Sequence, residues 1–523
     1  MFVRIKRFGP RNYLCIVENY REGKKVKQRT IAHLGRYEDL HQSGKLDALI
    51  KSLAKFSQDI AVLSAFKEDK SLSCWSKEWG SFLVFRRLWE RLGLPEIIER
   101  IQKRKKVEFN LEQALFYTVL HRLTERGSDL RASRWIERVY DPWQADLQYH
   151  HLIRAMGHMS ELKEEIEEEL FHTERDLFST ELDLVFFDTT SIYFEGEGPE
   201  GLARYGNSKD YKPSCKQMII GVVMRRDGRP LCCEFWPGNM SDIESLKEVV
   251  GRIKSRFSIK RVILVCDRGM VSRENIAFLE KEEFGYILGV RLRRVKRVRQ
   301  EVLSRSGRYR EVKENLKVKE VELGEERYIV CLNPEEAKRD KDNREQLVSD
   351  LEEKLRKSPS TIITNRGYKK YLKIEKDALK LNLSKIKEEV RFDGKFVLTT
   401  NTELAAEEVA VTYKNLLQVE CAFRHLKDIL ETRPIYHQTA ESTKGHVFCS
   451  FLALLLVIEL RRRLSEKDDV PSWYEIIRDL RAFQAVKIDI DGKTFLIRSD
   501  FSGVAHRCFM AAGIKPPPQV TKM

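Results

Sequence analysis

The sequence lacks several features that would assign it to common protein classes. Its ten cysteines form no CxxC pair and have no histidine cluster beside them, which argues against a zinc site and against a disulfide framework. The chain does not open with the charged-then-apolar pattern of a secretory leader, and its longest apolar run, Val447 to Leu460, is too short to span a bilayer. It contains no internal repeat and no low-complexity tract. We therefore expect a globular protein in a reducing, cytoplasmic setting.

The composition indicates a large folded protein with an anionic partner. The chain has 523 residues, of which 42% are hydrophobic and 33% are charged, so two to four packed units are expected. Lys and Arg outnumber Asp and Glu by 95 to 80, giving a net charge of +15. Such a surplus is typical of proteins that bind nucleic acid, because cations that neutralise phosphates release condensed counterions. Many basic proteins bind no polyanion, so charge alone does not decide the question.

The periodicity of apolar residues changes several times along the chain. Residues 1–37 alternate like short antiparallel strands, with a turn around Gly23, and residues 45–178 then follow a helical period. A Gly-Ser break before Asp129 is compatible with a helix-turn-helix DNA reader, and an ordinary helical bundle explains it equally well. From Leu182 onward, three antiparallel strands, two of them joined at Asp227-Gly228, precede alternating helices and strands. This order predicts a mixed α/β sheet.

These changes divide the chain into six predicted parts. Residues 291–398 interrupt the α/β pattern with a basic run, short strands and a charged helix, and a long helix over about 403–431 then returns to the core. The last part is predicted to be helical and to close with a hairpin at Asp491-Gly492. The parts are a β unit (1–40), a helical DNA-binding region (45–178), the first core part (180–290), the insertion (291–398), the second core part (399–440) and the C-terminal region (441–523).

Two aspartates follow predicted strands of the α/β core. Asp188 comes directly after the first apolar strand, and Asp267 directly after the fourth. Open α/β sheets bind their ligands at the carboxyl ends of strands, so both side chains are expected at one site. An Asp at a strand end also turns the chain or caps the next element, and each residue taken singly fits that explanation equally well.

A glutamate in the predicted helix over 403–431 adds a third carboxylate. In a continuous helix, Tyr413, Leu416, Glu420, Phe423 and Lys427 share one face with the apolar stripe. Burying an unpaired carboxylate costs several kcal/mol, so a Glu on this face is expected to have a cation or another partner. A metal ion suits it better than Lys427, which lies two turns away and is too distant for a direct pair along the helix.

Together these residues resemble the catalytic set of the DDE transposases of bacterial insertion sequences. That family has a ribonuclease H-like core with two strand-end aspartates and a helical Glu after a β-containing insertion. One branch carries Tyr-x2-Arg-x3-Glu-x6-Lys, and Tyr413, Glu420 and Lys427 keep this spacing, whereas Leu416 stands in place of the Arg. Arg424 is a candidate to replace that arginine. The resemblance implies a mixed five-stranded ribonuclease H-like sheet flanked by helices.

The resemblance also implies the chemistry. Asp188, Asp267 and Glu420 would hold two Mg²⁺ or Mn²⁺ ions, since hard cations prefer carboxylate oxygens, and Asp188 would bridge both. Phosphoryl transfer depends on charge neutralisation and in-line positioning, which two such ions provide. The enzyme would cleave the inverted-repeat ends of its element and join them to target DNA, acting as a homodimer on paired ends near the nucleoid of a bacterium or archaeon.

Several basic residues are predicted to contact the DNA. The loop after the first strand offers two lysines, the run from 291 to 299 could guide a strand, and His446 either faces the site or belongs to the core. Two other functions remain open: a hydrolytic nuclease of the same fold, and a non-catalytic, domesticated DNA-binding protein. The predicted DNA-binding residues are Tyr413, Lys427, Arg424, Lys209, Lys212, Arg291, Arg293 and Arg294.

Overall fold

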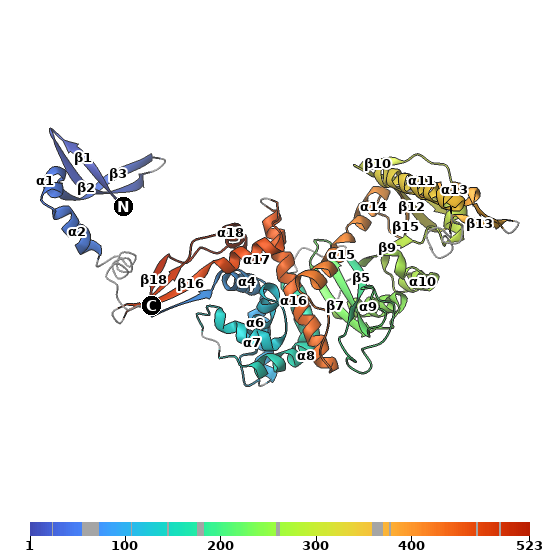
Figure 1. The fold of residues 1–523 in the computed structure, drawn as a ribbon, viewed down its shortest axis with the longest axis horizontal. Coiled ribbons are helices and arrows are strands. Elements are labelled where there is room, and N and C mark those ends of the chain that lie inside the picture. The colour runs from blue at the N-terminus through green and yellow to red at the C-terminus, as the bar shows by residue number, and fades with distance from the viewer. Residues whose placement is uncertain are drawn as a thin grey trace.

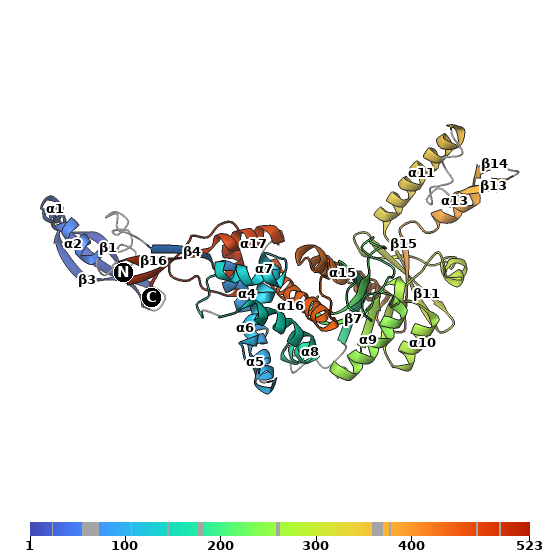
Figure 2. The same ribbon diagram turned by 60° about the horizontal axis from the view of Figure 1, so that its bottom comes forward.

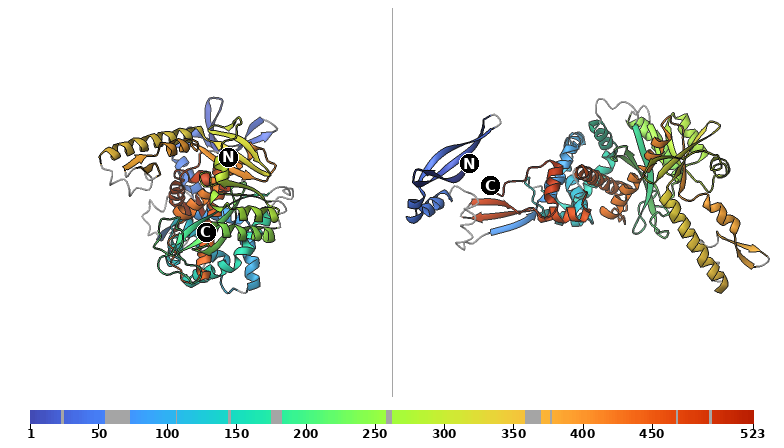
Figure 3. Two further views of the ribbon diagram at one scale, coloured as in Figure 1. Left: turned by 90° about the vertical axis from the view of Figure 1, so that its right-hand side faces the viewer. Right: turned by 90° about the horizontal axis from the view of Figure 1, so that it is seen from above.

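The computed structural model describes residues 1–22, 25–54, 73–105, 107–143, 146–174, 183–257, 262–357, 370–375, 378–466, 469–490 and 493–523. Figure 1 shows three parts along the long axis: a small N-terminal β unit, a helical body in the middle and a large sheet at the far end. The view from above in Figure 3 shows the same arrangement.

The N-terminal unit is the predicted antiparallel sheet. Its strands β1 (Phe2–Phe8), β2 (Arg11–Glu22) and β3 (Lys25–Arg36) lie in the order β1-β2-β3. Helix α1 (Tyr37–Gln42) packs against β2 and β3 and is followed by α2 (Lys45–Ala54). The prediction of three strands is confirmed, and the predicted turn at Gly23 lies outside the described residues.

The helical body combines two distant parts of the sequence. Helix α16 (Ala440–Ser465) packs against α6 (Leu111–Thr124) and α8 (Tyr149–Glu174), and the helices from both parts contribute to one hydrophobic core. By length and composition α16 could cross a membrane, but 83% of its apolar window is buried, so it is a core helix of this body. The remaining helices are α4 (Gly80–Arg91), α5 (Leu94–Lys105), α7 (Asp129–Trp135), η1 (Ile136–Arg138), α17 (Trp473–Ala482) and α18 (Ala505–Ala512).

Close contact between α8 and α16 depends on a glycine. A Cβ atom added at Gly445 would overlap the carbonyl oxygen of Met156, so the two helix backbones can approach each other only without a side chain there.

Helix α6 is buried on all sides and has no single apolar stripe. Every α6 residue except Gln113 is buried, as expected for a helix surrounded by others. The packing of α6 therefore favours the helical bundle over the helix-turn-helix alternative.

A second sheet was not predicted. Strands β16 (Gln484–Ile490), β17 (Lys493–Arg498) and β18 (Val520–Lys522) pair with β4 (Ser73–Glu78) in the order β18-β17-β16-β4. The predictions of a wholly helical region over 45–178 and of a mainly helical C-terminal part therefore need correction. Antiparallel pairing of β16 with β17 confirms the C-terminal hairpin, whose tip lies outside the described residues.

The large sheet contains the predicted mixed α/β core. Strands β5 (Asp183–Tyr193), β6 (Gln217–Arg225) and β7 (Pro230–Pro237) are antiparallel, and β8 (Val262–Cys266) and β9 (Gly285–Val290) run parallel to β5. Helices α9 (Asp242–Phe257) and α10 (Arg273–Lys281) accompany one face, where they share a core with the sheet. The other face packs against α14 (Ala406–Lys414), α15 (Leu417–Arg424) and the helical body.

Most strands of the insertion extend this sheet, and two others, β13 and β14, form a separate two-stranded sheet. Strands β10 (Arg310–Lys313), β11 (Leu316–Leu323) and β12 (Glu326–Leu332) join through β15 (Lys395–Thr400) to β9, so the large sheet has nine strands where five were predicted. The order is β10-β11-β12-β15-β9-β8-β5-β6-β7. Figure 2 shows the rest of the insertion projecting from the sheet: α11 (Pro334–Lys357), β13 (Leu372–Glu375), β14 (Ala378–Leu381) and α13 (Leu383–Val390).

Candidate active site

Asp188 and Asp267 lie on adjacent parallel strands. Asp267 directly follows β8, as predicted, but Asp188 lies inside β5, opposite Val222 of β6. The prediction that the strand ends before Asp188 was wrong because β6 pairs with β5 as far as Tyr193. The parallel pairing with β8, however, stops at Phe187. Both aspartates therefore lie one residue beyond the last pair of the parallel ladder between β5 and β8.

The carboxylate of Asp188 is held in a buried and acidic environment. The pKa of Asp188 is raised to about 6, mainly by burial and also by the negative charges of Asp267 and Asp242. The Lys209 ammonium and the backbone N–H of Thr189, which donates to Asp188 Oδ1 at 2.7 Å, act in the opposite direction. Asp188 and Asp267 are thus close enough to repel each other, and a bound cation would relieve that repulsion.

Asp242 was not among the predicted site residues. It is the first residue of α9, and its Oδ1 accepts a hydrogen bond from Thr189 Oγ1 at 2.6 Å. Lys209 Nζ lies 3.5 Å from the same oxygen and also donates to the carbonyl and hydroxyl of Thr189. Lys209 therefore lies beside Asp188, and its predicted contact with DNA stays a prediction. Asp242 could have been recognised from the sequence, because it is an acidic residue at the start of the helix that follows the third strand of the core.

Tyr413 fixes the position of Asp267. Its hydroxyl donates to Asp267 Oδ1 at 3.1 Å, and burial together with that carboxylate raises the pKa of Tyr413, so the hydroxyl stays protonated. A Cβ atom at Gly289 of β9 would overlap this hydroxyl, so the missing side chain makes room for the contact. In this structure Tyr413 therefore supports a site carboxylate, and its predicted contact with DNA stays a prediction.

Glu420 does not face inward as predicted. The expected continuous helix is broken into α14, α15 and a π-helix, η5 (His425–Ile429), and the first junction is closed by short i to i+3 hydrogen bonds such as Leu416 N–H to Tyr413 C=O. Both breaks change the rotational phase, so residues 413, 420 and 427 no longer share one face. Val419, Ala422 and Phe423 are buried in α15, whereas Glu420 and Arg424 are exposed.

Lys427 has a distant partner in the loop that carries Lys209. Its ammonium pairs at 2.8 Å with Asp210, whose side chain is only 4% exposed, and Arg433 also binds that carboxylate. Two cations around one buried carboxylate anchor the loop to the end of η5. Lys212, on the same loop, has an exposed side chain. The predicted DNA contacts of Lys427 and Lys212 stay predictions.

The predicted basic run borders the site. An open pocket of about 410 Å³ beside Asp267 is lined by Arg268 and by the first part of the run, Arg291 to Arg294. Arg291 donates to the carbonyls of Arg268 and Gly269, so it holds the backbone next to Asp267. Arg293 pairs with Glu389 at 3.1 Å, and Arg294 is exposed. The chain then continues into a π-helix, η3 (Val298–Val302).

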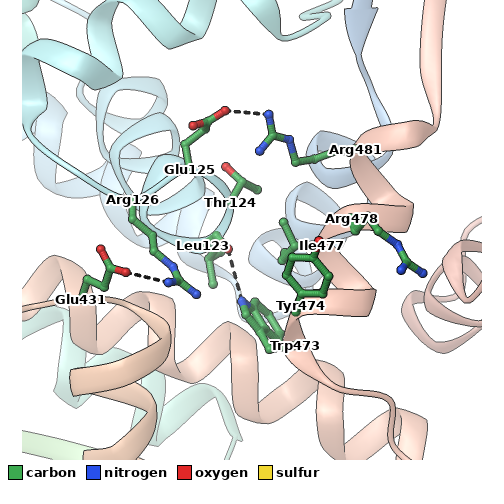
Figure 4. A pocket seen from close by; sticks show the side chains of 10 residues that line it. All are labelled: Leu123, Thr124, Glu125, Arg126, Glu431, Trp473, Tyr474, Ile477, Arg478 and Arg481. Atoms are coloured by element: carbon green, nitrogen blue, oxygen red, sulfur yellow. Dashed lines mark hydrogen bonds and ion pairs between the residues drawn. The ribbon is translucent and has the colours of Figure 1, made fainter.

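A second pocket, of about 470 Å³, lies between α17 and the turn after α6 (Figure 4). Its arginines are already paired: Arg126 with Glu431 at 2.7 Å, and Arg481 with Glu125 at 2.6 Å. The pair between Arg126 and Glu431 therefore links the helical body to the segment after η5, and the pocket offers little free positive charge.

His446 also belongs to the helical body, where its ring contacts Arg122 and the Thr432 carbonyl, which confirms the core alternative.

The donor set fits a hard metal ion in part. Asp188 and Asp267 offer carboxylate oxygens on neighbouring strands, the ligand type that Mg²⁺ and Mn²⁺ prefer. Over the ranges that the structure describes, no three His, Cys, Asp or Glu side chains are grouped closely enough to hold one ion. All ten cysteines are free thiols. Two carboxylates therefore lie on adjacent strands, and a metal site would need a third group to approach them.

Comparison with known proteins identifies two matching families. Residues 3–67 match the IS1634 family transposase N-terminal domain, and residues 179–456, more than half of the chain, match the transposase DDE domain. A solved structure of the piggyBac transposase synaptic complex with hairpin DNA is similar at a TM-score of 0.39 and 10% identity, covering 77% of this chain and 79% of that chain. Among curated proteins, none matches significantly.

Proposed function

Because the chain belongs to the DDE transposases and is a DNA transposase, we propose that it cuts the inverted-repeat ends of an insertion sequence and joins them to target DNA. The reaction would use two divalent metal ions held by Asp188, Asp267 and Glu420. The observation that carries this proposal is the placement of Asp188 and Asp267 where the pairing of two adjacent parallel strands ends. The strand order β7-β6-β5-β8-β9 supports a ribonuclease H-like core within the nine-stranded sheet.

The metal ions would neutralise charge on the phosphate and activate the attacking hydroxyl. The chain's own residues prepare the site for this. Tyr413 holds Asp267 by its hydrogen bond, and Arg291 holds the backbone beside it. Lys209 partly balances the acidic charge next to Asp188 until the substrate arrives.

Glu420 would complete the ligand set after a change in α15. This helix packs against β5 and β6, on the sheet face to which Asp188 belongs by strand alternation from the buried Phe186. Glu420 is exposed and is not grouped with the two aspartates among the described residues, so a rotation or shift of the helix would bring it to them. The breaks on either side of α15 supply short joints for such a movement.

The DNA path would run along the basic residues around these acids. Arg291, Arg293 and Arg294 border Asp267, and Arg424 is exposed beside Glu420 on α15. We further propose that the protein acts as a homodimer on paired DNA ends in the cytoplasm, at the nucleoid.

The test compares purified wild type with Glu420→Gln on labelled DNA carrying the flanking inverted repeats, in Mg²⁺ or Mn²⁺. Glu403→Gln, an exposed acid before α14, serves as the matched control. Metal-dependent nicking with joined products, lost in Glu420→Gln alone, is the expected result.

Other outcomes would redirect the proposal. Cleavage without joined products would identify a hydrolytic nuclease, and tight binding without cleavage by any protein would identify a non-catalytic DNA-binding protein. If Glu420→Gln stays active while Asp242→Asn is inactive, the third ligand is Asp242, the carboxylate that already lies beside Asp188.

A further inference from the structure

Positive charge is concentrated in the N-terminal sheet. Residues 1–36 contain ten Lys or Arg against two Glu, a net charge of +8, whereas the whole chain carries +15. About half of the surplus therefore lies in a small unit at the end of the molecule away from the catalytic sheet (Figure 1). A polyanion would be drawn to this unit first.

The strand register separates the charges onto two faces. Paired residues of an antiparallel sheet share a face, and alternate residues along a strand lie on opposite faces. Phe2, Arg4, Lys6 and Phe8 of β1 pair with Val17, Cys15, Tyr13 and Arg11 of β2, so these residues lie on one face. By alternation Arg21 lies there too. We call the face that carries Arg4, Lys6, Arg11 and Arg21 the basic face.

Both acidic residues of the sheet lie on the opposite face. Glu18 and Glu22 alternate with the β2 residues of the basic face, and they pair with Arg29 and Lys27. Helix α1 also covers that side, since Glu38 accepts a hydrogen bond from Asn12 at 2.9 Å. The cations of the opposite face are thus partly neutralised, whereas Arg4 and Lys6 of the basic face have neutral hydrogen-bond partners.

Polar groups hold the cations of the basic face in place. Arg4 Nη1 donates to Gln28 Oε1 at 2.9 Å, and Lys6 Nζ donates to Thr30 Oγ1 at 2.8 Å. A guanidinium and an ammonium carry more N–H donors than one hydrogen bond uses, so both keep donors available, and their neutral partners leave the positive charge uncompensated. Arg4 lies opposite Cys15 in the register, and Cys15 is fully buried in the central strand. Ordered cations lose less side-chain entropy when they bind phosphates.

We propose that the basic face of the N-terminal sheet docks on the phosphate backbone of duplex DNA. Arg11 and Arg21 stand ten residues apart in β2, a span of about 33 Å at strand rise. This matches one turn of B-DNA, about 34 to 36 Å, so the two ends of the strand can meet phosphates one turn apart. The docking surface is separate from the acidic site, so it holds DNA without taking part in the chemistry.

The test uses two triple variants of the full chain with equal charge loss. Arg4→Gln, Lys6→Gln and Arg11→Gln remove two Arg and one Lys from the basic face. Arg7→Gln, Lys27→Gln and Arg29→Gln remove the same set from the opposite face. Binding to a labelled 40-base-pair random duplex is measured by fluorescence anisotropy over a range of salt concentrations, with thermal unfolding as the control for folding.

The basic-face variant should lose about 2.7 from the slope of log K against log salt, since each phosphate contact contributes about 0.9. At 0.1 M salt this corresponds to up to about 500-fold weaker binding. The opposite-face variant should stay within a few fold of wild type. Equal losses in both variants would indicate that only overall charge matters, and unchanged binding in both would exclude the sheet as a DNA surface; either result overturns the proposal.

The same variants separate this proposal from the catalytic one. At protein concentrations high enough to saturate the DNA, the basic-face variant should cleave like wild type, because its acidic site is intact. Loss of cleavage at saturation, with normal binding, would contradict the docking role while leaving the catalytic assignment untouched.

Discussion

The contact between Tyr413 and Asp267 allows a quantitative test of the site. Tyr413→Phe removes a hydroxyl that donates to the carboxylate at 3.1 Å. A hydrogen bond to a charged group contributes about 1.5 to 3 kcal/mol, so complete loss in the transition state would slow cleavage about 10- to 150-fold. The rate is measured in single-turnover nicking of labelled inverted-repeat DNA at saturating Mn²⁺.

Gly289→Ala should disturb the same contact from the other side. The new Cβ would overlap the hydroxyl and lie 3.0 Å from the ring carbon Cζ, so the ring must move away from Asp267. In the Tyr413→Phe background the overlap with the hydroxyl no longer exists, and the second change should cost less than it does alone.

The double-mutant cycle should therefore show a coupling of at least about 1 kcal/mol, well above the scatter for independent sites. Gly251→Ala, a position in α9 with open space around it, serves as the control and should leave the rate unchanged. Additive costs, or a Tyr413→Phe rate equal to wild type, would refute the view that this hydroxyl positions Asp267.

Three further predictions concern stability and the loop anchor. Glu167→Ala removes a fully buried carboxylate that pairs with cations of α8 and α9, and should lower the free energy of unfolding in urea by about 3 to 5 kcal/mol, whereas Glu164→Ala, exposed on the same helix, should change it by less than about 0.5 kcal/mol. Gly445→Ala should destabilise by about 1 to 3 kcal/mol through overlap with α8, while Gly157→Ala, which has open space, should stabilise by about 0.5 to 1 kcal/mol; the opposite order would show that the helices are not in close contact. Asp210→Asn leaves two cations without their carboxylate and should make the loop before β6 more sensitive to limited proteolysis and slow cleavage, and unchanged digestion would rule out an anchor.

The sequence was informative where structure depends on neighbouring residues. Strands β5 to β9 were predicted because their apolar runs are short and bounded by turn residues, and Asp267 was placed correctly because nothing extends β8 beyond Cys266. The end of β5 was misplaced because its length is set by pairing with β6, which the polar Thr189 to Ser191 segment does not reveal.

Features that depend on distant residues could not be predicted. Strand β4 is a short polar segment whose partner, β16, lies some four hundred residues away, where Glu78 pairs with Gln484. The orientation of Glu420 depends on two interruptions of the helix that the apolar period does not record. Asp210 lies 217 residues from Lys427, so no local pattern could connect them.

The way the helical body is divided along the chain has a consequence for biosynthesis. Its first helices and β4 are made before the large sheet, but α16, α17, α18 and β16 come after it. During translation the apolar surface of the early helices therefore stays exposed until the ribosome has produced the last part of the chain. A message shortened anywhere in that last part would yield a product that contains Asp188 and Asp267 but cannot complete its core, and such a product should be removed by proteases before it could act on DNA.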